Sequence, residues 1–212
     1  MGRNKTQEEM SDAVHFEGEE RRKMSPSDSA FNDQFSQKRI YVNPGETLWL
    51  KGEEEMLVTT VGSGVVLSIY EEKLKFGVLS HFVLTPPMID LFPNFRQAES
   101  ACMDEVCAPI EKAVQEIKKY GAGKKRIRVR LFGGAELPGR DPDEGLKNYV
   151  FIKEYLSRKG LSVMSEDIGG TYLRRVHFFP HNGNANRFIL RRKEDVQRIT
   201  KEQSEYFDSL NN

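Results

Sequence analysis

The sequence has few cysteines, no net charge and no long hydrophobic run. Two cysteines among 212 residues are too few for a framework of disulfide bonds. Basic and acidic residues balance at 32 each, so no net field favours nucleic acid or an anionic membrane as a partner. No apolar stretch is long enough to cross a bilayer, and residues 3–10 lead into no hydrophobic signal-peptide region. We therefore expect a cytoplasmic protein without membrane insertion.

The two cysteines, Cys102 and Cys107, lie five residues apart in a segment with helical periodicity. Too few other ligand-type side chains cluster near them for a zinc site, and free cysteines are commonly buried. The glycines within residues 61–66 lack the lysine and the following helix that a phosphate-binding loop needs. We expect two apolar core residues here, and neither a metal nor another cofactor.

Composition divides the chain into three parts. Residues 1–37 are polar with scattered hydrophobic side chains, and such a segment buries too little surface to fold alone. We therefore expect a disordered N-terminal extension. Residues 38–192 carry the strand and helix patterns of one domain. Residues 193–212 place apolar side chains among charges at helical spacing, which predicts an amphipathic C-terminal helix.

Within the central domain, β-branched and alternating runs predict strands, and apolar residues three or four positions apart predict helices. Pro109 predicts a kink in the first helix, or a helix that begins near Asp104. The order strands, helix, strand, helix, strands is typical of an α+β domain with mixed or antiparallel sheets. The predicted strands cover residues 39–42, 47–50, 65–70, 76–84, 126–132, 161–164, 172–179 and 187–191, and the predicted helices cover 97–120 and 148–159.

The stretch 57–87 carries the pattern with the clearest chemical meaning. It predicts two strands joined by a charged turn, and a small-residue elbow, Gly62-Ser63-Gly64, precedes the first strand. His81 lies in the second strand. A tight glycine elbow that faces a histidine on a neighbouring strand is a place to expect a nucleophile and its base.

This stretch resembles the core motif of the chemoreceptor glutamine deamidase family, CheD, which has a Gly-Ser-Cys elbow and a histidine one hairpin later. Further motifs follow in the family's order, and together they cover about Ile40 to Arg191. They are Phe132-Gly133-Gly134-Ala135, similar to the family's FGGA; Gly145-Leu146-Lys147-Asn148, similar to its G-x-x-N; and Asp167-Ile168-Gly169-Gly170 with Arg174-Arg175-Val176, similar to its D-x-GG…GRKV.

The resemblance implies a three-layer α-β-β sandwich with two main helices, and an activity that converts receptor glutamines to glutamates through a cysteine thiolate. His81 aligns with the family's base, and Gly64 stands where the family has its nucleophilic cysteine. The family's orienting threonine falls on Val58 in an ungapped alignment, and Thr60 would share a strand face with residue 58. Ser63 and the segment Phe132-Gly133-Gly134-Ala135 are the implied substrate-binding residues.

Two functions of different class follow from Gly64. In the first, the protein binds chemoreceptor cytoplasmic helices, or the CheC-type phosphatase with which family members pair, with little or no catalysis. In the second, it remains a deamidase that uses Ser63, a water activated by His81, or one of the cysteines. Because neighbouring side chains of an extended chain point in opposite directions, and a hydroxyl is a weaker nucleophile than a thiolate, we favour the binding function.

Overall fold

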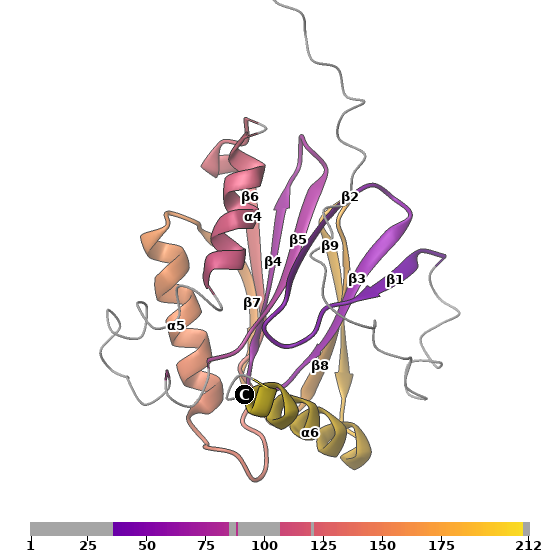
Figure 1. The fold of residues 1–212 in the computed structure, drawn as a ribbon, viewed down its shortest axis with the longest axis vertical. Coiled ribbons are helices and arrows are strands. Elements are labelled where there is room, and N and C mark those ends of the chain that lie inside the picture. The colour runs from indigo at the N-terminus through magenta and orange to yellow at the C-terminus, as the bar shows by residue number, and fades with distance from the viewer. Residues whose placement is uncertain (1–35, 85–87, 89–106, 120, 210–212) are drawn as a thin grey trace, which may run out of the picture.

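The computed structural model describes residues 36–84, 88, 107–119 and 121–209 (Figure 1). The predicted N-terminal extension therefore lies almost wholly outside the described residues. The strands are β1 Lys38–Tyr41, β2 Thr47–Lys51, β3 Glu55–Val61, β4 Val65–Glu71, β5 Phe76–Phe82, β6 Ile127–Gly133, β7 Val163–Ile168, β8 Leu173–Phe179 and β9 Asn184–Leu190. The helices are α4 Ala108–Lys119, α5 Glu144–Arg158 and α6 Lys193–Ser209, with a short 3₁₀ turn, η4, at Lys124–Arg126.

The strands form two sheets, each of mixed direction. One sheet has the order β1-β3-β8-β9 and the other has the order β2-β5-β4-β6-β7. The pairs β1 with β3 and β6 with β7 are parallel, whereas the remaining pairs are antiparallel. This arrangement confirms the predicted α+β class with mixed sheets.

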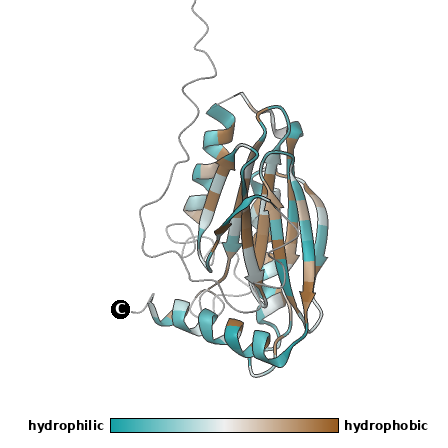
Figure 2. Cartoon of the chain, turned by 90° about the vertical axis from the view of Figure 1, so that its right-hand side faces the viewer, coloured by the Kyte–Doolittle hydropathy of each residue, from teal (hydrophilic) through white to brown (hydrophobic). Residues whose placement is uncertain are grey.

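The five-stranded sheet is buried on both faces, and β4 shows why. Val65, Leu67 and Ile69 pack in the cluster that includes α4 and α5. Val66 and Tyr70 point the other way and pack against the four-stranded sheet. Alternate residues of a strand face opposite sides, so the near-continuous apolar run of β4 supplies both cores at once. The brown strands between teal outer surfaces in Figure 2 show the same distribution.

Several strands differ from the prediction. The residues before the elbow form a strand of their own, β3, in the other sheet. β7 continues to Ile168, so only Gly169-Gly170 remains of the predicted turn, and β9 begins at Asn184. β7 and β9 are edge strands with many exposed residues. Backbone pairing with one neighbour, and not hydrophobic alternation, therefore defines their length.

One helix, α5, also begins at another residue than predicted. α5 starts at Glu144, four residues before the predicted Asn148. The described part of the first predicted helix starts at Ala108, and Pro109 lies in its first turn, where proline is tolerated. Cys107 is fully buried against this layer, as expected, whereas Cys102 lies outside the described residues. None of the described helices is long and apolar enough to cross a membrane.

Candidate functional site

The elbow Gly62-Ser63-Gly64 connects the two sheets. β3 ends at Val61 in the four-stranded sheet, and β4 begins at Val65 in the five-stranded sheet. Three residues thus cross between the layers, and the elbow is buried. A Cβ on Gly62 would contact Leu173 of β8, whereas a Cβ on Gly64 would contact His81 of β5.

His81 projects from β5 into the space between the sheets, on the same face of its strand as Leu79. It is 4% exposed, and its Nδ1 lies 2.9 Å from Oγ1 of Thr59 on β3. This hydrogen bond fixes the plane of the ring. In the tautomer in which Nδ1–H donates this hydrogen bond to the Thr59 oxygen, the lone pair of the imidazole lies on Nε2, as a general base requires.

Position 64 faces that base nitrogen. A Cβ atom built on Gly64 would lie 3.2 Å from Nε2 of His81. The backbone of Gly64 is not in the left-handed region, so an L side chain is conformationally allowed. The same Cβ would approach a methyl of Val83 at 2.8 Å and the carbonyl of Phe82 at 2.9 Å. These neighbours would need to shift slightly, since such contacts are shorter than normal packing allows.

The hydroxyl that contacts His81 belongs to Thr59, the residue before the expected Thr60. Leu57 and Val61 pack between the sheets, whereas Val58 packs in a cluster on the other face of β3. Alternation therefore directs Thr59 toward His81 and Thr60 away from it. Thr60 nevertheless lines, with Thr59 and His81, a cavity of about 10 Å³.

Ser63 points into a different environment from Gly64. Its hydroxyl donates to Oε1 of Glu144 at 2.8 Å, and it accepts from Nε2 of Gln203 at 3.0 Å. Arg140 donates two hydrogen bonds to the Glu144 carboxylate, at 2.9 and 2.8 Å. Ser63 therefore belongs to a polar cluster (Ser63, Arg140, Glu144 and Gln203) whose hydrogen bonds do not include the His81–Thr59 pair.

The segment Gly133-Gly134-Ala135 holds the elbow through its main chain. The N–H of Gly134 donates to the carbonyl of Gly64 at 2.7 Å, and the N–H of Ala135 donates to the carbonyl of Gly62 at 2.9 Å. Gly133 and Gly134 both have positive φ, which L side chains rarely adopt. The motif thus lies directly beside position 64.

The Gly145-x-x-Asn148 motif anchors α5 to this segment. A Cβ on Gly145 would lie 2.5 Å from the carbonyl oxygen of Gly134, so a larger residue would separate the helix from the loop. The side-chain oxygen of Asn148 accepts the N–H of Leu84 at 2.6 Å, just after the His81 strand. The motif therefore positions the elbow and the base strand relative to one another.

The Asp167…Gly170 motif also has a structural role. Arg174 is fully buried, and its Nη2 donates to Oδ1 of Asp167 at 3.1 Å and to the carbonyl of Gly169 at 2.8 Å. These contacts join the end of β7 to the start of β8. The motif thus fixes the connection from β7 in one sheet to β8 in the other.

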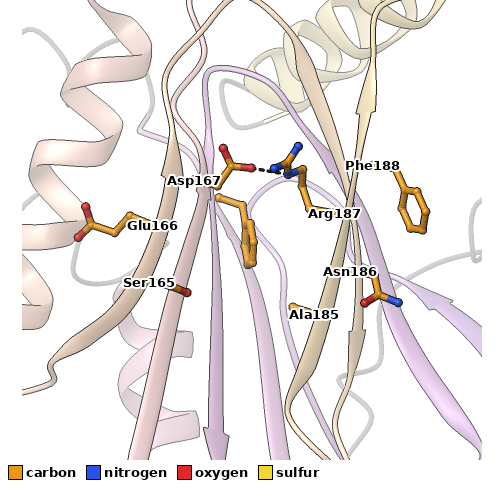
Figure 3. Close-up of a pocket in the computed structure, with 8 residues that line it drawn as sticks. Ser165, Glu166, Asp167, Ala185, Asn186, Arg187 and Phe188 are labelled. Atoms are coloured by element: carbon orange, nitrogen blue, oxygen red, sulfur yellow. Dashed lines mark ion pairs between the residues drawn. The ribbon is translucent and has the colours of Figure 1, made fainter.

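A wider cavity lies away from His81, between the edge strands β7 and β9. It has a volume of about 730 Å³, and Phe132 forms part of its lining. Asp167 and Arg187 form an ion pair of 2.6 Å across it (Figure 3). Of the implied substrate-binding residues, Phe132 therefore faces this cavity, whereas the segment Gly133–Ala135 contacts the elbow.

The C-terminal helix closes the space at His81. Ile199, Glu202 and Gln203 of α6 line the 10 Å³ cavity together with His81, Thr59 and Gly62. Figure 1 shows α6 lying across one end of the strands. The amphipathic pattern predicts this helix but not its location, because its polar contacts join residues 140 positions apart in the sequence.

The family model and the relatives that match this chain all name one family. The sequence model described as "CheD chemotactic sensory transduction" matches residues 96–187. A probable chemoreceptor glutamine deamidase CheD of Vibrio vulnificus is 30% identical over 190 residues, which cover 85% of this chain and 84% of the relative. A protein of the same name from Halorhodospira halophila is 31% identical over 156 residues, covering 72% of this chain and 71% of the relative.

Proposed function

The chain belongs to the CheD family of chemoreceptor glutamine deamidases, and from this premise we propose that it binds chemoreceptor cytoplasmic helices with little or no catalysis of its own. The relatives are named for action on chemoreceptors. The proposal keeps that partner class, and it includes a CheC-type phosphatase as a second protein partner. We also propose the family's three-layer α-β-β sandwich, supported by α4 and α5 on one face of the five-stranded sheet and the other sheet on the opposite face.

The observation that carries the proposal is position 64. In the family's mechanism a thiolate attacks the side-chain amide carbon, ammonia leaves, and water hydrolyses the resulting thioester. Gly64 supplies no sulfur at the point where a Cβ would lie 3.2 Å from Nε2 of His81. The base side of the site is present without the atom that it would activate.

Of the side chains considered as substitutes, Cys102 lies outside the described residues, and neither Ser63 nor Cys107 is well placed. The Ser63 hydroxyl is engaged by Glu144 and Gln203 on the other side of the elbow. Cys107 packs in the helix-facing core of the five-stranded sheet, whereas His81 faces the opposite side of that sheet. Both arrangements support loss of the thiol mechanism.

The second candidate is a deamidase in which His81 activates water directly. The intact His81–Thr59 hydrogen bond favours it, since an oriented imidazole can serve as a general base. Enzymes that lose their nucleophile commonly lose several orders of magnitude in rate. We therefore expect any such activity to be small.

The test is a deamidation assay by mass spectrometry on a purified chemoreceptor cytoplasmic fragment. The natural protein, Gly64→Cys and Gly64→Ala are compared, because Gly64→Ala adds the Cβ without the sulfur. We expect conversion of glutamine to glutamate with Gly64→Cys alone. Conversion by the natural protein, abolished by His81→Gln, would instead establish the water mechanism.

A further inference from the structure

α6 has the features of a docked amphipathic peptide. It spans 17 residues, and its buried residues are Asp195, Ile199, Gln203 and Phe207, spaced by four. Ile199 packs in a small apolar cluster with Ala135, Leu137, Leu173 and Leu190. The rest of the helix is largely hydrophilic, as its mostly teal colour in Figure 2 shows. Few apolar side chains therefore hold α6 in place.

A glutamine stands at the centre of this buried stripe. Gln203 is 4% exposed, and its Nε2 donates to Oγ of Ser63 at 3.0 Å and to Oε1 of Glu144 at 2.8 Å. Burying an amide costs free energy unless it is hydrogen-bonded. A glutamine at this position therefore requires hydrogen-bonding partners. Gln203 also lines the small cavity at His81.

The partners of Gln203 form a receptor for a side-chain amide. Glu144 is buried and oriented by the two hydrogen bonds from Arg140, and Ser63 belongs to the elbow next to position 64. A carboxylate and a hydroxyl oxygen accept hydrogen bonds from an amide nitrogen. The surface beneath α6 thus combines an amide-binding group with apolar positions on either side.

We propose that α6 occupies, within the same chain, the surface on which the partner helix docks, with Gln203 in the place of the partner's glutamine. The inference rests on the proposed function for the identity of that partner. The occupant that replaces α6 is an amphipathic helix with a glutamine flanked by apolar residues four positions before and after it. Ile199 and Phe207 have this spacing around Gln203. α6 is then a self-inhibitory element that binding must displace.

The first arm of the test uses no partner protein and measures how strongly α6 protects a thiol at position 64. Gly64→Cys supplies a reporter thiol, and its alkylation rate is read by peptide mass spectrometry in backgrounds with Gln203→Ala or Gln197→Ala. Gln197 is an exposed glutamine of the same helix and gives a matched control. We expect alkylation to be about ten- to a hundredfold faster with Gln203→Ala, since loss of a buried hydrogen-bonding group shifts a local opening equilibrium by that order.

Equal rates in the two backgrounds would overturn the proposal. Alkylation of the buried Cys107 reports whether the fold survives. If Gln203→Ala also exposes Cys107, Ile199→Ala replaces it, because that change loosens α6 without removing a polar partner. The alkylation rate of Gly64→Cys is then compared between Ile199→Ala and Gln197→Ala, and equal rates would overturn the proposal.

The second arm measures binding of a chemoreceptor cytoplasmic fragment with Gly64 in place. We expect about tenfold tighter binding by Gln203→Ala than by Gln197→Ala, because apparent affinity scales with the fraction of open molecules. Equal or weaker binding would overturn the proposed displacement. If no variant binds, the proposed function fails, and the alkylation rates decide separately whether α6 closes the site.

Discussion

Two consecutive residues of the elbow face opposite kinds of surroundings. On one side, a Cβ on Gly64 would lie 3.2 Å from Nε2 of His81, whose Nδ1 is hydrogen-bonded to Thr59. On the other side, Ser63 completes a buried network with Glu144 and Gln203. The first side pairs an imidazole with a residue that has no side chain, and the second is a hydrogen-bonded network around an amide. The two sets of contacts can therefore be altered separately by substitution, because Gly64 and Ser63 make different contacts.

The largest expected effect is on the pKa of a thiol placed at position 64, beside His81. In Gly64→Cys, an imidazolium at His81 should stabilise the thiolate and lower the thiol pKa by about two units, which raises the thiolate population at pH 6 about a hundredfold. Ultraviolet thiolate absorbance across a pH titration measures it, with Gly64→Cys/His81→Gln as the reference. A thiol that titrates as an ordinary free cysteine would show that the cleft is not preserved.

In the Gly64→Cys variant, substitutions of Thr59 and Ser63 should affect the thiol pKa differently. Adding Thr59→Val should raise the thiol pKa by about half a unit to one unit, since it removes a hydrogen bond worth about 1 kcal/mol. Adding Ser63→Ala should leave the thiol pKa unchanged, because Ser63 contacts the other side. Equal responses would mean that the two environments are coupled.

The next effect concerns the contact between α5 and the Gly134-Ala135 main chain, which holds the elbow. Gly145→Ala brings a Cβ against the carbonyls of Gly134 and Ala135, at 2.5 and 2.6 Å. We expect the free energy of unfolding to fall by about 1–3 kcal/mol, as for overpacking of a rigid contact, measured by denaturant titration. Gly123→Ala is the matched control, since its Cβ would meet nothing closer than 3.6 Å. A neutral Gly145→Ala would show that α5 is free to move from the loop.

The smallest effect lies on the surface, away from the elbow. The Tyr149 hydroxyl, at 2.7 Å, and Lys153 hold the pKa of Glu166 below its usual range. Because the folded-state pKa is depressed, this stabilisation is present above the unfolded pKa of about 4.3 and is lost as pH falls through the folded pKa. Glu166→Gln should therefore lower the free energy of unfolding by less than about 1 kcal/mol at neutral pH.

Thermal unfolding of the natural protein and Glu166→Gln between neutral and acidic pH tests this effect. The difference should disappear at the acidic end. A difference that persists there would mean that Glu166 acts through packing and not through its charge.

Local pattern was enough to find the elements that carry the site. The Gly62-Ser63-Gly64 elbow, the strand with His81 and the terminal helix all have periodic or small-residue signatures. The structure brings position 64 and His81 together, as the motif predicted. The contact from Thr59 was missed because the threonine was transferred from an ungapped alignment, and a shift of one residue reverses the face of a strand.

Long-range features had no signature in the sequence. Gln203 reads as an ordinary polar residue of an amphipathic helix, and only the fold brings it to Ser63. The main-chain contact behind Gly145 is likewise invisible, because the partner atoms are carbonyls that every residue has. The polar edge strands β7 and β9 are defined by backbone pairing, which composition does not encode.

The elbow is held by its carbonyl groups, which accept from the N–H groups of Gly134 and Ala135. Peptide groups are the same whatever amino acid is encoded, so the shape of this turn is not tied to the residue at position 64. Some glycine codons differ from a cysteine codon by one base. One base change can therefore exchange glycine and cysteine at position 64, while the main-chain hydrogen bonds that hold the turn stay in place.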